Sequence, residues 1–133
     1  MIENKIKNYF TTKTDIAAVY LYGSYASGQV HPGSDVDVAI LFGKRDREIV
    51  DKRLEKIHVE LSRILKKDLH LVALDFAGEV LLNQILKKGR CLIVNDTKTL
   101  TYFAMEALTK VADFQYYLKK MQSAMTRRVR EGL

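Results

Sequence analysis

Two apolar runs separated by a short polar stretch constrain the fold of this chain more than any other feature. The runs cover residues 16–22 and 36–42, and both have the composition of buried strands. A Gly-Ser pair at 23–24 ends the first run, and Asp35 and Asp37 open the second. We therefore expect a Gly-Ser corner and two acids to converge at the ends of these strands.

The two acids share one face of the second strand. Alternate side chains of a strand point the same way, so Asp35 and Asp37 lie together while Val36 and Val38 enter the core. Two carboxylates this close repel each other unless a cation lies between them, and Mg²⁺ prefers such oxygen ligands. The spacing predicts a site for one or two magnesium ions, held by Asp35 and Asp37.

The Gly-Ser pair fits the phosphate side of such a site. Gly23 lets the backbone approach a ligand, Ser24 offers a hydroxyl donor, and successive N–H groups in a turn hold phosphate oxygens. Ser34, directly before the first acid, is expected to steady the loop. Phosphate and metal sites side by side describe a nucleoside triphosphate site, with Gly23, Ser24 and Ser34 as its nucleotide-binding residues.

Gly-Ser, ten residues and then Asp-x-Asp within a strand resembles the signature of the polymerase-beta-like nucleotidyltransferase superfamily. The short chain also resembles the minimal nucleotidyltransferase (MNT) family, many of whose members are antitoxin partners of HEPN-domain toxins. The resemblance is specific in residues 19–42 and loose elsewhere. It implies transfer of AMP from ATP to a tyrosine hydroxyl of a HEPN toxin, with Asp35 and Asp37 as catalytic residues.

Two positions depart from the family pattern. The family places a third carboxylate on the strand predicted at 69–74, where this chain has His70; Asp68, two residues earlier on the same face, is the alternative third acid. Many relatives also carry arginine where this loop has Ser27, and losing that charge weakens phosphate binding by about 1.5–3 kcal/mol. A catalytically inactive, binding-only antitoxin and a small-molecule nucleotidyltransferase acting as a homodimer are therefore the alternative hypotheses.

The rest of the chain predicts an α/β (α+β) fold, a small mixed sheet of about four strands flanked by helices. Helical spacing of apolar residues recurs in residues 2–10, 46–67 and 75–88, and short apolar runs typical of strands cover 69–74 and 91–94. The lone cysteine, Cys91, lies in the last run and is expected to be a buried structural thiol.

Length and charge set further limits. With 133 residues, 47% of them hydrophobic, we expect a single nucleotidyltransferase domain over 1–133 with its core at about 1–96. The chain has no run of 18 apolar residues, and its start lacks the apolar centre of a signal peptide. We expect a cytoplasmic protein with no membrane partner, and the net charge of +6 suits a polyanionic ligand or an acidic partner.

The last helix, predicted over about 97–130, is the longest element. From Leu100 to Met125 its apolar residues alternate at spacings of four and three, the heptad seam of a helix that packs along another helix. At ~1.5 Å per residue it would be ~48 Å long, more than a small domain can cover. We expect its first half to pack on the domain and Tyr116–Arg130 to contact a protein partner. Direct binding of nucleic acid is not expected, because no base-reading module occurs.

Overall fold

The two strands on either side of the acidic motif pair directly with each other. In the computed structural model, which describes residues 1–132, β1 (Ala18–Tyr22) and β2 (Val36–Leu41) are antiparallel neighbours. Each strand is one or two residues shorter than the apolar run that predicted it. Their register places Tyr22 opposite Asp37, so the end of β1 lies beside the start of β2.

Two further strands complete the predicted mixed sheet of four strands, and the strand order is β3-β2-β1-β4. β3 (Leu69–Ala73) is parallel to β2, and β4 (Arg90–Val94) is antiparallel to β1. A parallel pair needs a crossover connection, which α3 (Arg47–Leu65) supplies. The β2–β3 register places His70 beside Asp37.

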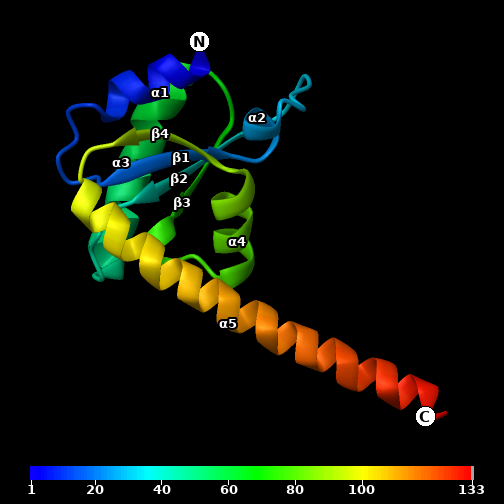
Figure 1. The fold of residues 1–133 in the computed structure, drawn as a ribbon. Coiled ribbons are helices and arrows are strands. Elements are labelled where there is room, and N and C mark those ends of the chain that lie inside the picture. Colours follow the sequence, from blue (N-terminus) through cyan, green and yellow to red (C-terminus); the bar gives the residue numbers. More distant parts are fainter. Residues whose placement is uncertain (133) are drawn as a thin grey trace.

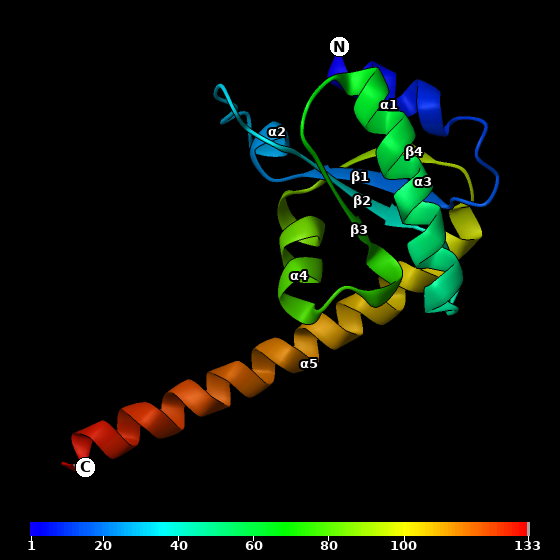
Figure 2. The same ribbon diagram turned by 180° about the vertical axis from the view of Figure 1, so that it is seen from behind.

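Helices cover both faces of the sheet (Figures 1 and 2). On one face, α1 (Ile2–Phe10) and α3 pack over the buried apolar side chains of β1 and β2. These are Val19, Leu21, Val36, Val38 and Ile40. On the other face, α4 (Glu79–Lys88) and the first half of α5 (Thr97–Arg130) cover the alanines and Leu41. The largest fully buried side chains include Phe10, Ile6, Ile16, Leu21, Ile40, Leu41, Ile57, Leu61 and Ile85.

The continuous helix predicted at 75–88 is wrong in its first residues. A 3₁₀ turn, η1 (Leu74–Phe76), follows β3, and α4 begins only at Glu79. The carboxylate of Asp75 instead accepts the backbone N–H groups of residues 42–44, at 2.9, 2.7 and 3.2 Å. Asp75 therefore fixes the chain after β2, a role that its place in a helical pattern did not indicate.

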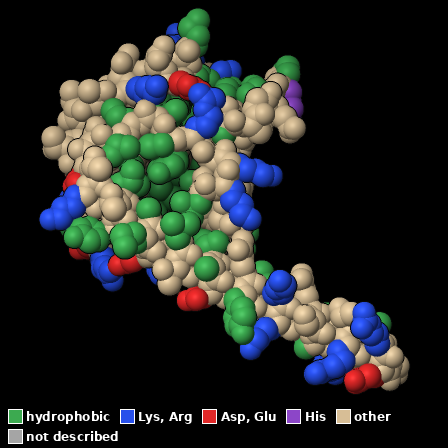
Figure 3. All heavy atoms as spheres, viewed as in Figure 1, with side chains coloured by type: hydrophobic (Ala, Val, Ile, Leu, Met, Phe, Trp, Pro, Cys, Tyr) green, Lys and Arg blue, Asp and Glu red, His purple; other side chains and the backbone are tan. Residues whose placement is uncertain are grey.

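The last helix packs over its first half and then leaves the rest of the protein (Figure 1). Ala107 and Val111 are buried against the sheet and α4, whereas residues 115–130 are all exposed. Figure 3 shows Lys and Arg side chains gathered along the projecting part, with hydrophobic side chains among them. The predicted division of this helix into a packed and a projecting half is confirmed.

Cys91 is exposed, so the prediction of a buried thiol is wrong. It lies on β4, which is an edge strand, and there Leu92 is the residue that enters the core. Partial desolvation still raises the pKa of the Cys91 thiol, which disfavours a nucleophilic role. Separately, none of the helices within residues 1–132 is long and apolar enough to cross a membrane.

An ion pair joins Asp15, three residues before β1, to Arg53 of α3. It makes the stability of the fold depend on pH. Arg53 donates to the carboxylate of Asp15 through Nε at 2.5 Å and Nη2 at 3.2 Å, and this lowers the pKa of Asp15 below 3.8. A carboxyl with a lowered folded-state pKa stabilises the fold above its unfolded pKa and loses that contribution as pH falls through the folded pKa. The pair therefore stabilises the protein at neutral pH, and this stabilisation is lost in acid when Asp15 is protonated.

We predict that Arg53→Met lowers the free energy of unfolding by about 1 kcal/mol at pH 7, and that the difference from wild type shrinks below about pH 4. Urea denaturation over a pH series measures both. Lys52→Met is the matched control, because Lys52 and its partner Glu48 are 75% and 80% exposed. A difference that stays constant down to about pH 2 would contradict the assignment.

Candidate functional site

Asp37 lies at the centre of a small polar site at the start of β2. Its side chain is 24% exposed, and its Oδ1 lies 3.3 Å from Nδ1 of His70 on β3. The other carboxylate oxygen, Oδ2, lies against Gly23 at the end of β1. Three neighbouring strands therefore place the Gly-Ser corner, Asp37 and His70 side by side in that order.

Gly23 is the residue that lets Asp37 occupy this position. Its φ of +70° belongs to the region that favours glycine, and a Cβ there would lie 2.2 Å from Oδ2 of Asp37. The corner continues as one helical turn, α2 (Ser24–Ser27), where sequence analysis expected a loop. The first N–H groups of a helix have no partners within it, so this turn offers donors close to Asp37.

Asp35 directly precedes β2 and is exposed. Val36 and Val38 are fully buried on the face covered by α1 and α3, so the two acids lie on the opposite face, as the alternation predicted. Asp68 occupies the corresponding place before β3, where its carbonyl accepts the N–H of Val36 at 2.9 Å.

The oxygen donors of this site suit a hard cation whose remaining ligands come from a nucleotide. Within residues 1–132 no group of three or more His, Cys, Asp or Glu side chains is arranged to hold a metal ion. Mg²⁺ is commonly bound through one or two carboxylates together with substrate phosphates, so Asp35 and Asp37 fit it as a pair.

His70 occupies the position where sequence analysis expected a third acid. Its ring is 63% exposed, yet Nδ1 faces both Oδ1 of Asp37 at 3.3 Å and the hydroxyl of Tyr22 at 3.4 Å. Burial, together with the charge of Asp37, raises the pKa of Tyr22 to about 12, so this hydroxyl keeps its proton at neutral pH. Tyr22 was missed by sequence analysis, because only the strand register brings it to Asp37.

Ser34 and Ser27 organise the backbone around the motif. Ser34 Oγ accepts the N–H of His31 at 3.0 Å and lies 3.2 Å from the ring Nδ1 of His31, which steadies the turn before Asp35. Ser27 is exposed at the end of α2, and its hydroxyl donates to the carbonyl of Ser24 at 3.2 Å. Neither serine brings positive charge to the site.

The geometry of a glycine corner and paired strand acids has a counterpart in known proteins. Residues 4–98 match the family described as Polymerase beta, Nucleotidyltransferase. The chain belongs to this nucleotidyltransferase family. Its four-stranded mixed sheet is thus the sheet of a nucleotidyltransferase domain.

One curated protein and one solved structure are individually similar to this chain. The protein adenylyltransferase MntA of Shewanella oneidensis is 35% identical over 72 residues, 54% of this chain and 50% of MntA, so the matched part spans half of that curated relative. A chain of a crystal structure described as a toxin-antitoxin with AMP-PNP superposes with a TM-score of 0.69 at 26% identity, over 98% of this chain and 99% of that chain.

A second solved structure is similar in fold. It is described as a tri-AMPylated Shewanella oneidensis HEPN toxin in complex with MNT antitoxin. Its TM-score is 0.62 at 24% identity, over 97% of this chain and 96% of that chain.

Replacing Gly23 tests the packing at the centre of the site. We predict that Gly23→Ala destabilises the protein by at least about 1 kcal/mol more than Gly28→Ala. Both glycines have positive φ, +70° and +78°, but a Cβ at Gly28 meets nothing within 4 Å, whereas one at Gly23 meets the Asp37 carboxylate. Urea denaturation measures the two values, and equal losses would show that Asp37 does not constrain position 23.

Proposed function

We propose that this nucleotidyltransferase transfers AMP from ATP to a tyrosine hydroxyl of a HEPN-family toxin, and so acts as the antitoxin of that protein. The observation that carries the proposal is the contact of Asp37 with the Gly23 corner in a chain of this family. The relative named a protein adenylyltransferase and the toxin-antitoxin structure with AMP-PNP support the reaction and the nucleotide.

Asp35 and Asp37 are the proposed catalytic residues and metal ligands, and the oxygen donors of this pair favour Mg²⁺. A bound Mg²⁺ would neutralise charge on the triphosphate and on the departing pyrophosphate. Gly23 and Ser24 would hold the phosphates through N–H and hydroxyl donors at the start of α2, while Ser34 keeps the loop in place. Because the protein forms no covalent intermediate in this scheme, positioning of ATP and acceptor supplies the rate.

The projecting half of α5 is the proposed surface for the partner protein. Tyr116, Tyr117, Met121, Met125 and Val129 are each 44% or more exposed there, and aromatic residues and methionine are enriched at protein interfaces. We propose that about 1–96 form the catalytic core and 97–130 the partner-binding helix of one nucleotidyltransferase domain. ATP as the substrate favours the cytoplasm as the compartment.

Loss of the two acids should abolish transfer. Wild type, incubated with α-labelled ATP, Mg²⁺ and the product of the neighbouring gene, which we expect to be a HEPN protein, is predicted to label that protein. Asp35→Asn/Asp37→Asn should lower the rate by at least about a hundredfold, because the carboxylates that hold the metal are gone. Asp51→Asn, an exposed acid on α3, is the control and should keep the wild-type rate.

The same experiment tests the alternative hypothesis of a binding-only antitoxin. This alternative is favoured by His70, which stands where the third acid was expected. If wild type neutralises the HEPN protein without moving label, and Asp35→Asn/Asp37→Asn neutralises it equally well, occlusion explains the activity and the enzymatic proposal is wrong. Label transfer to a small molecule in place of the protein would contradict the proposed acceptor.

The apolar stripe of α5 should matter for complex formation and hardly for folding. We predict that Met121→Asp/Met125→Asp weakens binding to the HEPN protein by at least about tenfold, because two buried interface side chains would become charged. The thermal midpoint should stay within about 2 °C of wild type, since both methionines are exposed in the free protein, at 44% and 62%.

Thr126→Asp is the matched control for that variant. It adds a charge to the same exposed helix away from the two methionines, because Thr126 lies about 140° around the helix from Met121 and about 100° from Met125. Calorimetric titration of the partner measures the three affinities. Unchanged binding by Met121→Asp/Met125→Asp would exclude this stripe as the interface.

A further inference from the structure

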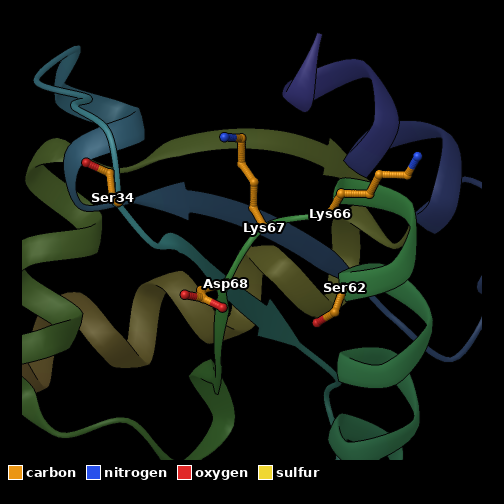
Figure 4. Close-up of a pocket in the computed structure, with 6 residues that line it drawn as sticks. Ser34, Ser62, Lys66, Lys67 and Asp68 are labelled. Carbon is orange, nitrogen blue, oxygen red and sulfur yellow. The ribbon is translucent and has the colours of Figure 1, made fainter.

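A second pocket lies at the same end of the sheet, across β2 from the Gly-Ser corner. It has a volume of about 450 Å³ and opens to solvent between the end of α3 and the loop before β2 (Figure 4). Its lining residues are Gly33, Ser34, Ser62, Lys66, Lys67 and Asp68. It is next to the candidate site along the chain, because Ser34 directly precedes Asp35 and Asp68 stands two residues before His70. Ser62 and Lys66 place it on the α3 face of the sheet, opposite the two acids.

The charge of the pocket favours an anion. Lys66 and Lys67 are exposed, and within residues 1–132 neither has an acidic partner within 4.0 Å. Lys66 ends α3 in a left-handed conformation, φ +54°, and the chain turns there toward β3. Figure 4 shows the two lysines diverging from this turn, with Lys67 extending between the Ser34 loop and α3. Asp68 is the single acid in the lining.

Ser62 supplies a second, independent sign of a ligand. Its Oγ is buried, and among the described residues it is the one buried side-chain oxygen or nitrogen without a hydrogen-bond partner. Buried hydroxyls are normally satisfied, because leaving one unpaired costs free energy. An oxygen acceptor bound in the pocket would accept the hydrogen bond that Ser62 can donate.

Strand order decides which substrate this pocket faces. The Gly-Ser corner follows β1 on one side of β2, and Asp68 precedes β3 on the other side. In phosphoryl transfer the attacking and leaving oxygens lie roughly in line on opposite sides of the phosphorus. Since the proposed function places the leaving pyrophosphate at the β1 side, the acceptor hydroxyl approaches from the β3 side, over His70. A segment of the acceptor that passes the end of β3, which is an edge strand, then reaches the pocket on the α3 face.

We propose that the pocket binds an anionic group of the acceptor protein, a carboxylate or phosphate close to the reacting hydroxyl. Lys67, with Lys66 beside it, provides the positive charge, and Ser62 donates a hydrogen bond. The proposal rests on the proposed function for the direction of transfer.

Steady-state kinetics of AMP transfer to the HEPN protein test the pocket. Lys67→Ala should raise KM for the acceptor by about tenfold, equivalent to about 1.4 kcal/mol, and leave KM for ATP within about twofold. Ser62→Ala, which removes a hydroxyl without a partner in the free protein, should keep the thermal midpoint and raise the acceptor KM by about threefold. Lys67→Arg should restore most of the acceptor affinity, and Lys52→Ala, on the exposed face of α3, should change neither constant.

Two kinetic results would overturn the proposal. A rise of KM for ATP with an unchanged acceptor KM would assign the lysines to the triphosphate. Wild-type constants in both Lys67→Ala and Lys66→Ala/Lys67→Ala would mean that the pocket binds neither substrate.

A binding measurement separates failure of this proposal from failure of the proposed function. Inorganic phosphate is titrated against chloride at equal ionic strength, and amide shifts of residues 62–68 are followed by NMR in wild type and in Lys66→Ala/Lys67→Ala. Saturable shifts in wild type that the double variant loses support an anion site, even if wild type transfers no AMP. Absence of such shifts in wild type overturns the pocket whatever the enzyme does.

Discussion

The contact between the Asp37 carboxylate and the backbone of Gly23 is the constraint on which the rest of the site depends. It requires a residue without a side chain at φ +70°, and it requires β1 and β2 to pair so that Tyr22 lies opposite Asp37. Once both conditions hold, the first turn of α2 begins within reach of a strand acid. In the proposed function, donors for phosphate and ligands for a cation then share one small volume at the end of the sheet.

The sheet divides this volume into two sides with different chemistry. On the β1 side, uncharged backbone and serine donors surround the carboxylates. On the β3 side, His70 contacts Asp37 and the Lys66–Asp68 turn adds two cations beyond it. Where the family resemblance predicted a third acid, this chain has His70, whose ring lies beside Tyr22 and Asp37. In the proposed function, the phosphates of the nucleotide therefore complete the metal site of Asp35 and Asp37.

In the proposed function, the long last helix binds the partner protein at a distance from the site of AMP transfer. Its first half is part of the second hydrophobic cluster, so the position of the helix is fixed by the same core that supports β2. Residues 115–130 are exposed, with Gln115 still hydrogen-bonded to Asn83 of α4. They present a stripe of aromatic residues and methionines beside several cations. In the proposed function, this stripe binds the acceptor protein.

The amino-acid sequence by itself determined the four strands, the helices α1, α3 and α5, and the shared face of Asp35 and Asp37, because alternation and helical spacing are local properties of the backbone. It also indicated that the last helix would extend beyond the core. Only the tertiary structure decided that His70 and Tyr22 meet Asp37, that Asp75 breaks a predicted helix to bind residues 42–44, and that Cys91 is exposed. It alone joined Ser62 to two lysines in one pocket. These features depend on strand order and register, which bring together residues tens of positions apart and leave no periodic trace in the sequence.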